Sequence, residues 1–492
     1  MLGSCRAPAH RASAEWQDGN VSSAVVVGSG PNGLAAAVHL AARGVTVRVL
    51  EAQETFGGGC RSSEPTLPGV VADDCSAFHP LAAASPFLAG LGLEAEGLRW
   101  RWPEVQLSHP LDGGREGVLW QDLDRTVAGL GRDGPAWDAI VGRTARDFAT
   151  LVGEVLAPPV HRPRHPWALA RFGLDALLPA TLTARRWRDD EARALFGGIA
   201  AHAFAPLSAP LTTSVGLVLA ATAHAVGWPV AEGGSQSITA ALARRLESLG
   251  GSIQTRTTVT SIGELDGADL VLLDLAPAAA ARLLGPRLPA TTARAYSRFR
   301  RGPAAFKVDF AIEGDIPWTS ENARRAGTVH LGGTFEEIAR AEADITRGRM
   351  PARPFVLVGQ QYLADPTRSR DGINPIWSYA HVPHAYAGDA TEAVIAQIER
   401  FAPGFRRRVR GVASRGPAAL AAHNANYVGG DIGTGATTGL QLIARPVLSP
   451  NPYATGVPGV YLCSAATPPG PGTHGMSGYR AAGAALDWLS RR

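Results

Sequence analysis

The sequence predicts an α/β fold with a parallel, doubly wound sheet, and three observations within its first 51 residues point to it. A β-branched run over residues 24–27 breaks at a Gly-x-Gly-x-x-Gly motif, after which an Ala/Leu-rich helical pattern begins. Gly44 stands where the C-terminal cap of that helix belongs, and residues 45–50 alternate as a second strand that ends in Glu51. Strand, glycine turn, helix and second strand in this order are typical of a Rossmann-type βαβ unit.

The glycine motif has the chemistry of a dinucleotide-binding loop. Gly28 suits the tight turn, Gly30 lets the backbone approach a pyrophosphate, and Gly33 lets the helix pack closely on the strand. The helix N-terminus adds free N–H groups and partial positive charge. Glu51 follows about 20 residues later, where the motif places a carboxylate for the ribose. The candidate ligands in this unit are Gly28, Gly30, Pro31, Asn32, Gly33 and Glu51.

Composition limits the other possibilities. A chain of 492 residues is too long for one ordinary core, so we expect two domains. The net charge of +4 is small for this length and gives no reason to expect a nucleic acid partner. The 4 cysteines show neither a CxxC pair nor metal-ligand spacing, so we expect no metal and reduced thiols in a cytoplasmic protein. Residues 1–21 are polar and small, and we expect a disordered tail there instead of a signal peptide.

Two later stretches add to this pattern. A second glycine loop over residues 56–62 permits close backbone approach at Gly58 and Gly59, and Arg61 can reach a phosphate. Residues 194–231 contain no Asp, Glu, Lys or Arg, but their prolines leave too short a helix to span a membrane. We expect this segment to form a buried helix that lines an apolar cavity, or a shallow entry at a membrane surface.

The chain returns to the α/β pattern twice. A helix that ends near Leu249 precedes strands over 252–257 and 268–274, and a last strand near residue 460 leads through a Pro/Gly loop to a small-residue helix. That helix begins near Gly475, so its N-terminus forms a second anion site like the first.

These blocks together resemble FAD-dependent phytoene-desaturase-like oxidoreductases, in particular the subgroup of pyridine nucleotide-disulfide oxidoreductase domain-containing protein 2. The resemblance covers nearly the whole chain after residue 22. It rests on the two glycine loops and on EGGSQSI at 232–238, FKVDF at 306–310, HVP at 381–383, NYVGGD at 426–431 and THGMSGY at 473–479.

The resemblance implies a Rossmann-type FAD-binding domain with an interleaved α+β substrate domain. The FAD domain is then discontinuous, over residues 22–75, 228–283 and 450–492, and the substrate domain takes residues 76–227 and 284–449. The resemblance also implies that the backbone of Val259 contacts adenine and that Gly475 and Met476 present the last helix to the flavin.

Catalytic candidates follow partly from the resemblance and partly from residue type. His79 lies in a segment that resembles the one passing under the flavin, and His474 precedes the last helix. Lys307 is the single lysine among 47 basic side chains, and a buried lysine can lose its proton where arginine cannot. The resemblance to amine-oxidase-like flavoproteins gives Lys307 a place on a substrate-domain strand, bonded through water to the flavin. A lysine with its stem packed and its head in solvent is the simpler alternative.

The resemblance implies an FAD enzyme that removes hydride from an apolar isoprenoid or lipid-like substrate, or isomerises it on reduced flavin. The electron acceptor is open between O2, quinone and NAD(P). A flavin amine oxidase is the first alternative, although Ser464-Ala465-Ala466 stands where amine oxidases usually carry a Gly-Glu pair. A prenyl- or lipid-binding chaperone of the same fold is the second. We expect a cytoplasmic location with peripheral membrane contact.

Overall fold

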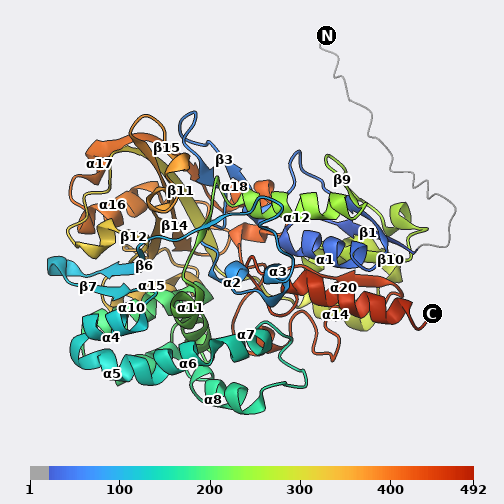
Figure 1. The fold of residues 1–492 in the computed structure, drawn as a ribbon, viewed down its shortest axis with the longest axis horizontal. Helices are drawn as coiled ribbons and strands as arrows, with labels where there is room; N and C mark the ends of the chain where they lie inside the picture. The colour runs from blue at the N-terminus through green and yellow to red at the C-terminus, as the bar shows by residue number, and fades with distance from the viewer. Residues whose placement is uncertain (1–21) are drawn as a thin grey trace, which may run out of the picture.

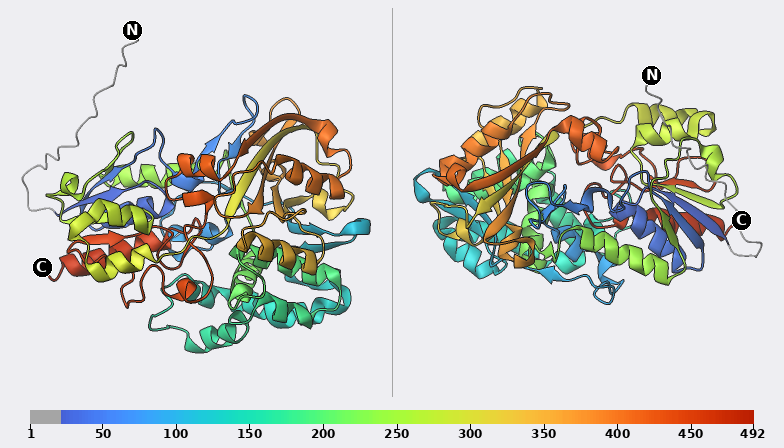
Figure 2. Two further views of the ribbon diagram at one scale, coloured as in Figure 1. Left: turned by 180° about the vertical axis from the view of Figure 1, so that it is seen from behind. Right: turned by 90° about the horizontal axis from the view of Figure 1, so that it is seen from above.

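The computed structural model describes residues 22–492, so the expected tail over residues 1–21 lies outside the described residues. Two sheets lie at opposite ends of the molecule, one built from the blue, green and red parts of the chain and one mainly from the orange part (Figures 1 and 2). The predicted fold class is confirmed, because the first sheet is wholly parallel and has helices on both faces.

The first sheet has five parallel strands in the order β16-β10-β1-β2-β9. Its strands come from three separate stretches of the chain, and the proposed division into domains stays a prediction. They are β1 (Ser23–Val27), β2 (Thr46–Leu50), β9 (Ser252–Gln254), β10 (Leu270–Leu273) and β16 (Val460–Leu462). The expected strand over 252–257 stops at Gln254, because Arg256 takes a positive φ of 55° that ends the ladder.

Alternate side chains of this sheet enter two cores. Ala24, Val26 and Leu272 pack under α1 (Pro31–Ala41), α12 (Gln236–Ser248) and α20 (Met476–Leu489). The other face, with Val25 and Leu273, packs under α13 (Pro277–Leu284) and α14 (Ala290–Ser297). With both faces covered, strand ends at the carboxyl edge are the exposed part that can hold a ligand.

The second sheet has seven strands in the order β15-β11-β14-β13-β12-β6-β7. Its pairs are antiparallel except β12 with β6, which is parallel. The strands are β6 (Val105–Pro110), β7 (Glu116–Leu119), β11 (Ala304–Glu313), β12 (Ala326–Leu331), β13 (Val356–Gly359), β14 (Ile373–Val382) and β15 (Val409–Arg415). Two short ribbons pair β3 (Ser62–Ser63) with β4 (Ala72–Asp73) and β5 (Trp100–Arg101) with β8 (Val230–Ala231).

Helices cover both faces of the second sheet. One face packs against α16 (Thr391–Phe401) and α17 (Phe405–Arg408), and the other against α10 (Asp190–Ala200), α11 (Thr212–Val226) and α15 (Phe335–Thr346). The remaining helices are α2 (Pro80–Ala83), α3 (Pro86–Ala89), α4 (Leu123–Gly129), α5 (Gly134–Trp137), α6 (Arg143–Arg146), α7 (Phe148–Val155), α8 (Pro166–Ala176), α9 (Ala180–Thr183), α18 (Pro417–His423) and α19 (Leu440–Ile443).

The uncharged stretch over 194–231 folds into the end of α10, the helix α11 and the loops that flank it. Its prolines lie outside α11, which therefore runs for only 15 residues. Within residues 22–492, no helix is long and apolar enough to cross a membrane. Phe204, Leu211 and Val215 of this stretch line the large cavity between the two sheets, which confirms that the segment forms the wall of an apolar cavity.

Candidate functional site

A cavity of about 930 Å³ extends from the carboxyl edge of the parallel sheet to the helices of the second domain. At one end it meets the two glycine loops and Glu51. At the other end its wall is apolar and comes from α8, α11 and the loops around them. Its apolar residues are Leu156, Ala157, Leu169, Phe172, Ala176, Leu177, Leu211, Val215, Val218 and Leu219, and the paired side chains of Glu154 and His161 also line the cavity.

The first glycine loop has the geometry of a dinucleotide turn. Gly28 takes a φ of 99° and donates its N–H to Leu50 O at 2.8 Å, which fixes the turn between the first two strands. A Cβ on Gly30 would lie 2.6 Å from Asp274 Oδ2, so a side chain there would displace the Asp274 carboxylate. Gly33 does not line the cavity. A Cβ on Gly33 would collide with Gly28 O, in agreement with its expected packing role.

Glu51 lies at the cavity wall and is already held by local hydrogen bonds. Its Oε2 accepts the Ser29 N–H at 3.0 Å and the Ser29 hydroxyl at 2.5 Å, and its Oε1 accepts the Gln53 N–H at 2.8 Å. The carboxylate is thereby oriented beside the loop, where the motif places it against a ribose. Its role as a ribose ligand stays a prediction.

The second glycine loop packs directly on the first. A Cβ on Gly58 would lie 2.8 Å from the Cα of Gly30, and a Cβ on Gly59 would collide with the Tyr427 hydroxyl. The Arg61 guanidinium donates to Gly58 O at 3.0 Å and to His423 O, and its side chain lines the cavity. The two loops therefore form one cradle of backbone at the dinucleotide end of the cavity.

The structure brings most of the remaining predicted ligands to this cavity. Pro31, Asn32 and Val259 line it, with Asn32 Oδ1 buried and without a hydrogen-bond partner among the described residues. Gly475 and Met476 do not line it: Gly475 is the N-cap of α20, and the Met476 N–H donates to His474 Nδ1 at 3.0 Å.

Two predicted catalytic histidines face the cavity. His79 Nε2 is hydrogen-bonded to Ser235 Oγ at 2.7 Å, and burial lowers its pKa to about 4. Burial also lowers the pKa of His474 to about 4, against the carbonyls of Gly470 and Pro471, which favour the protonated ring. Both rings are therefore neutral at pH 7. Their catalytic role stays a prediction.

Lys307 lies outside the cavity wall. It is buried on β11, 3% exposed, and forms an ion pair with Asp309 two residues along the same strand face. Its ammonium lies 6.0 Å from the ring centre of Trp377, and Trp377 does line the cavity. The solvent-exposed alternative is wrong, because both the stem and the head of Lys307 are buried. Burial raises the pKa of Cys75 and lowers that of His423, which both line the cavity, and the charge of Lys307 acts to lower both pKa values.

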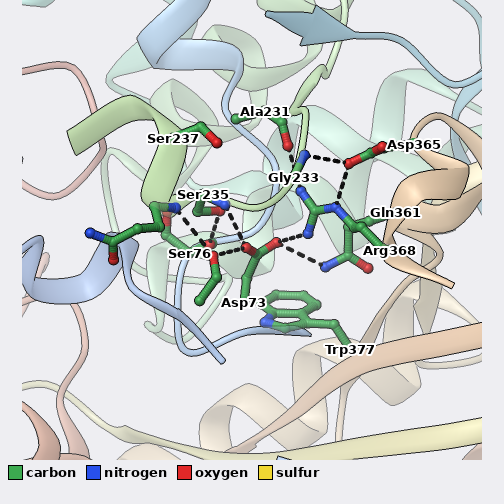
Figure 3. A network of polar contacts seen from close by, with 12 residues as sticks. Asp73, Ser76, Ala231, Gly233, Ser235, Ser237, Gln361, Asp365, Arg368 and Trp377 are labelled. Atoms are coloured by element: carbon green, nitrogen blue, oxygen red, sulfur yellow. Dashed lines mark hydrogen bonds and ion pairs between the residues drawn. The ribbon is translucent and has the colours of Figure 1, made fainter. Parts of the chain in front are cut away.

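A buried charge network joins the two domains behind the cavity wall (Figure 3). Arg368 donates to Asp73 at 2.6 Å, to Asp365 at 3.0 Å and to Ala231 O at 2.7 Å. Asp73 also accepts the Ser235 N–H at 2.6 Å. Since Ser235 holds His79, this network sets the position of the strand-and-loop segment that passes beneath the cavity.

The sheet side of the cavity carries aromatic and polar groups that the sequence did not single out. Trp377 and Tyr379 from β14 lie at 5.0 Å between ring centres, in an edge-to-face arrangement. Thr328 from β12 and His202 from the turn after α10 complete this wall. Thr328 Oγ1 is buried and has no hydrogen-bond partner among the described residues.

Behind His202 lies a cluster of buried histidines from separate elements. His202 and His330 are 5.0 Å apart between ring centres, and His330 and His109 are 6.5 Å apart. His381 pairs with the buried Glu342 at 2.7 Å. Burial lowers the pKa of His330 well below its usual value, so this ring is neutral. Within residues 22–492, no group of such side chains has the arrangement of a metal site.

Asp274 is a residue of the cavity lining that sequence reasoning missed. It follows β10, the strand beside β1, and its Oδ2 accepts the Gly33 N–H at 3.1 Å. The sequence could have indicated this position, because Asp274 ends a predicted parallel strand. The carboxyl ends of parallel strands lie at one edge of the sheet, where the glycine loop also lies.

The residues present fit FAD. Glycines at positions 28, 30 and 58 line the cavity with bare backbone, and the loop joins a helix N-terminus. The cavity then continues beyond this cradle, past Cys60 and Ser76, to the apolar wall. One continuous cavity therefore offers a dinucleotide cradle at one end and an apolar chamber at the other.

Comparisons with known proteins agree with this geometry. Residues 26–87 match the model of the NAD(P)-binding Rossmann-like domain. The chain is similar to rat (Rattus norvegicus) pyridine nucleotide-disulfide oxidoreductase domain-containing protein 2, with 25% identity over 93% of this chain and 92% of the relative. Hydroxyneurosporene desaturase of Cereibacter sphaeroides is 31% identical over 47% of this chain and 48% of its own. Cyclohexylamine oxidase of Brevibacterium oxydans has a similar fold, with a TM-score of 0.59 and 17% identity over 96% and 100% of the two chains.

The resemblance that the sequence showed is thereby confirmed at the level of the fold and of similarity over nearly the whole chain. The geometry of the cradle and these comparisons together support an FAD-dependent oxidoreductase with a Rossmann-type cofactor domain.

Proposed function

We propose that the protein is an FAD-dependent oxidoreductase that desaturates or isomerises an apolar isoprenoid or lipid-like molecule. The observation that carries the proposal is the continuity of the cavity: its dinucleotide end adjoins a chamber whose far wall is aliphatic and aromatic. A volume of about 930 Å³ lies near the upper end of ligand cavities, roughly 1,000 Å³.

FAD, when bound, would accept hydride from a carbon of the substrate. The residues of this chain would do the rest. The backbone of Gly28, Gly30 and Gly58 would hold the pyrophosphate, and Glu51 the ribose. The α8 and α11 side chains would orient the substrate and exclude water, which protects a reactive carbon centre from hydrolysis.

The neutral histidines at the wall suit the second half of such a reaction. His202 Nδ1 bonds to Ile199 O at 3.0 Å, which places the proton on Nδ1 and leaves Nε2 as an acceptor. Burial lowers the pKa of His202 to about 4. A base this weak can still take a proton from the strongly acidic cation that hydride loss leaves behind.

Amine oxidation is the second candidate, supported by the cyclohexylamine oxidase fold and by the aromatic pair Trp377 and Tyr379 at the cavity wall. The Phe204 and Tyr379 rings are parallel, but their centres are only 6.2 Å apart. A substrate amine between two rings needs roughly twice the usual 3.5–4.0 Å contact distance, so this pair leaves too little room.

The proposal is tested by anaerobic flavin reduction. The purified protein is expected to be yellow, and its flavin absorbance is followed against geranylgeraniol, a long-chain acyl ester, putrescine and cyclohexylamine. Reduction by the apolar compounds alone supports desaturation, whereas reduction by an amine alone supports the second candidate.

A cavity-filling variant separates substrate binding from cofactor binding. Val215→Trp places a large ring into the apolar chamber and is expected to abolish reduction by the apolar substrate while FAD stays bound. Leu174→Trp is the matched control, because Leu174 lies on α8 with 75% of its side chain exposed. If Val215→Trp reduces as fast as the unmodified protein, the substrate does not occupy this chamber.

A further inference from the structure

Two carboxylates already occupy the hydrogen-bond donors of the dinucleotide loop. Glu51 accepts the Ser29 N–H, and Asp274 Oδ2 accepts the Gly33 N–H at 3.1 Å. The Gly30 N–H also faces the Asp274 carboxylate. These N–H groups belong to the turn and helix N-terminus that a pyrophosphate needs. The site therefore offers two negative side chains where a dianionic ligand is to bind.

Asp274 has no counter-ion to relieve this conflict. Its side chain lines the cavity, 8% exposed, and it follows β10 directly. The titratable groups that face it are Glu51 from β2 and the Cys463 thiol from β16. Within residues 22–492, no cation is among the groups that shift its pKa. Asn426 contacts only its backbone carbonyl, at 2.9 Å.

We propose that Asp274 is a proton-binding site coupled to the cofactor: the dinucleotide binds with uptake of one proton onto the Asp274 carboxyl group. The proton neutralises the carboxylate nearest the pyrophosphate and turns one of its oxygens into a hydrogen-bond donor. No bond other than this O–H is made or broken in the protein. The proposal rests on the cofactor site of the proposed function.

The charge state of Asp274 without the dinucleotide supports this coupling. Its pKa is raised to about 7: burial is the largest cause, the Glu51 charge acts in the same direction, and the Gly33 and Gly30 N–H groups act to lower it. Near neutral pH the group is therefore half protonated. Two added phosphate charges raise its pKa again, because like charges disfavour the ionised form.

Linkage gives the direction and size of the effect. At pH values between the Asp274 pKa of the free protein and the Asp274 pKa of the complex, FAD binding takes up one proton. The Kd for FAD therefore rises about tenfold for each pH unit in this range. The phosphate groups of FAD keep constant charge between roughly pH 6 and pH 9, so they add no such slope.

The test titrates full-length protein, freed of bound flavin, with FAD by calorimetry in pairs of buffers with different ionisation enthalpies. We expect uptake of about one proton per FAD at pH 8 and a Kd that rises with pH. In Asp274→Asn, which keeps the shape and an acceptor for the Gly33 N–H, proton uptake is absent and the Kd is independent of pH. At pH 8 this variant binds FAD about tenfold more tightly than the unmodified protein.

Asp133→Asn is the matched control. Asp133 is also buried and accepts backbone N–H groups, from Arg188 and Asp189, but it does not line the cavity. This variant is expected to keep the proton uptake and the pH slope. If Asp274→Asn does not fold, Asp274→Ser and the unmodified protein provide the same comparison.

The outcomes are distinguishable. FAD binding by the unmodified protein without proton uptake at pH 8 overturns the proposal and leaves the cofactor site intact. Equal uptake in Asp274→Asn overturns it too, because another group then takes the proton. If the unmodified protein binds no FAD at any pH, the proposed function itself fails.

Discussion

Replacement of Arg368 by methionine tests the network that joins the two domains. Arg368 is fully buried, and its guanidinium donates to the carboxylates of Asp73 and Asp365 and to Ala231 O. Arg368→Met keeps the length and the apolar stem of the side chain but removes the charge and five N–H donors. Two buried carboxylates then lose their cation.

The expected loss of stability follows from these contacts. Removing one partner of a buried ion pair costs about 3–5 kcal/mol, because an uncompensated charge stays behind. Here each carboxylate keeps other donors: Asp73 keeps the Ser235 N–H at 2.6 Å, and Asp365 keeps the Gly233 N–H at 2.8 Å. The loss therefore lies at the lower end, about 3 kcal/mol in the free energy of unfolding.

The loss of stability in Arg368→Met is expected to increase with pH. Burial acts to raise the pKa of Asp73, but Arg368 and the Ser235 N–H outweigh it and lower the pKa below the usual value. Because the pKa of Asp73 is lower in the folded state than in the unfolded state, its carboxylate stabilises the fold at pH values above the unfolded-state pKa. This stabilisation is lost as the pH falls through the folded-state pKa. In Arg368→Met burial dominates and the pKa rises, so the variant loses stability as the pH increases. The difference between the two proteins is larger at pH 8 than at pH 5.

Urea unfolding at both pH values, followed by circular dichroism, measures this difference. Arg370→Met is the control, because Arg370 lies two residues further on with 60% of its side chain exposed. It is expected to change the free energy of unfolding by less than about 0.5 kcal/mol. A loss below about 1 kcal/mol for Arg368→Met at pH 8, or an equal loss in the control, would refute the reasoning.

Three further substitutions address the predicted site residues. Gly30→Val is expected to purify without FAD, since its side chain would occupy the space of the pyrophosphate; full occupancy by flavin absorbance would place the cofactor elsewhere. His474→Ala is expected to alter the flavin spectrum and the rate of flavin reduction with FAD still bound, and unchanged values would remove it from the site. Lys307→Met leaves the buried Asp309 carboxylate without its cation and is expected to lower the free energy of unfolding by about 3 kcal/mol. Lys307→Arg keeps the positive charge. Flavin reduction and reoxidation at unmodified rates in Lys307→Arg would show a structural role.

The dinucleotide cradle could be predicted because its chemistry is local in the sequence. Gly28 needs a positive φ and Gly30 a close approach, and both requirements act within a few residues of one turn. The uncharged stretch over 194–231 likewise predicts burial from composition alone, and the structure places it in the cavity wall.

Contacts between distant segments could not be predicted in this way. The alternation along β11 predicts that Lys307 lies on the face opposite Phe306 and Val308. This holds, because Phe306 and Val308 belong to the hydrophobic core on the side of α16 and α17. Alternation does not say what that face meets. Its neighbour Asp309 lies on the same face two residues away, and the pair neutralises itself before either side chain reaches the cavity.

Burial, more than any single residue, sets the chemistry of the cavity. Several of its lining groups shift toward their uncharged forms: the pKa of Asp274 rises to about 7, and those of His79 and His202 fall to about 4. Glu154 is different, because its hydrogen bond with His161 lowers its pKa. Burial of these groups favours an apolar molecule over a charged one. It also means that a charge created during reaction is not screened by water, so the residues nearest to it have the greatest effect on rate. For this reason His202 and His474, which face the chamber, are better tests of catalysis than the buried pair of Lys307 and Asp309.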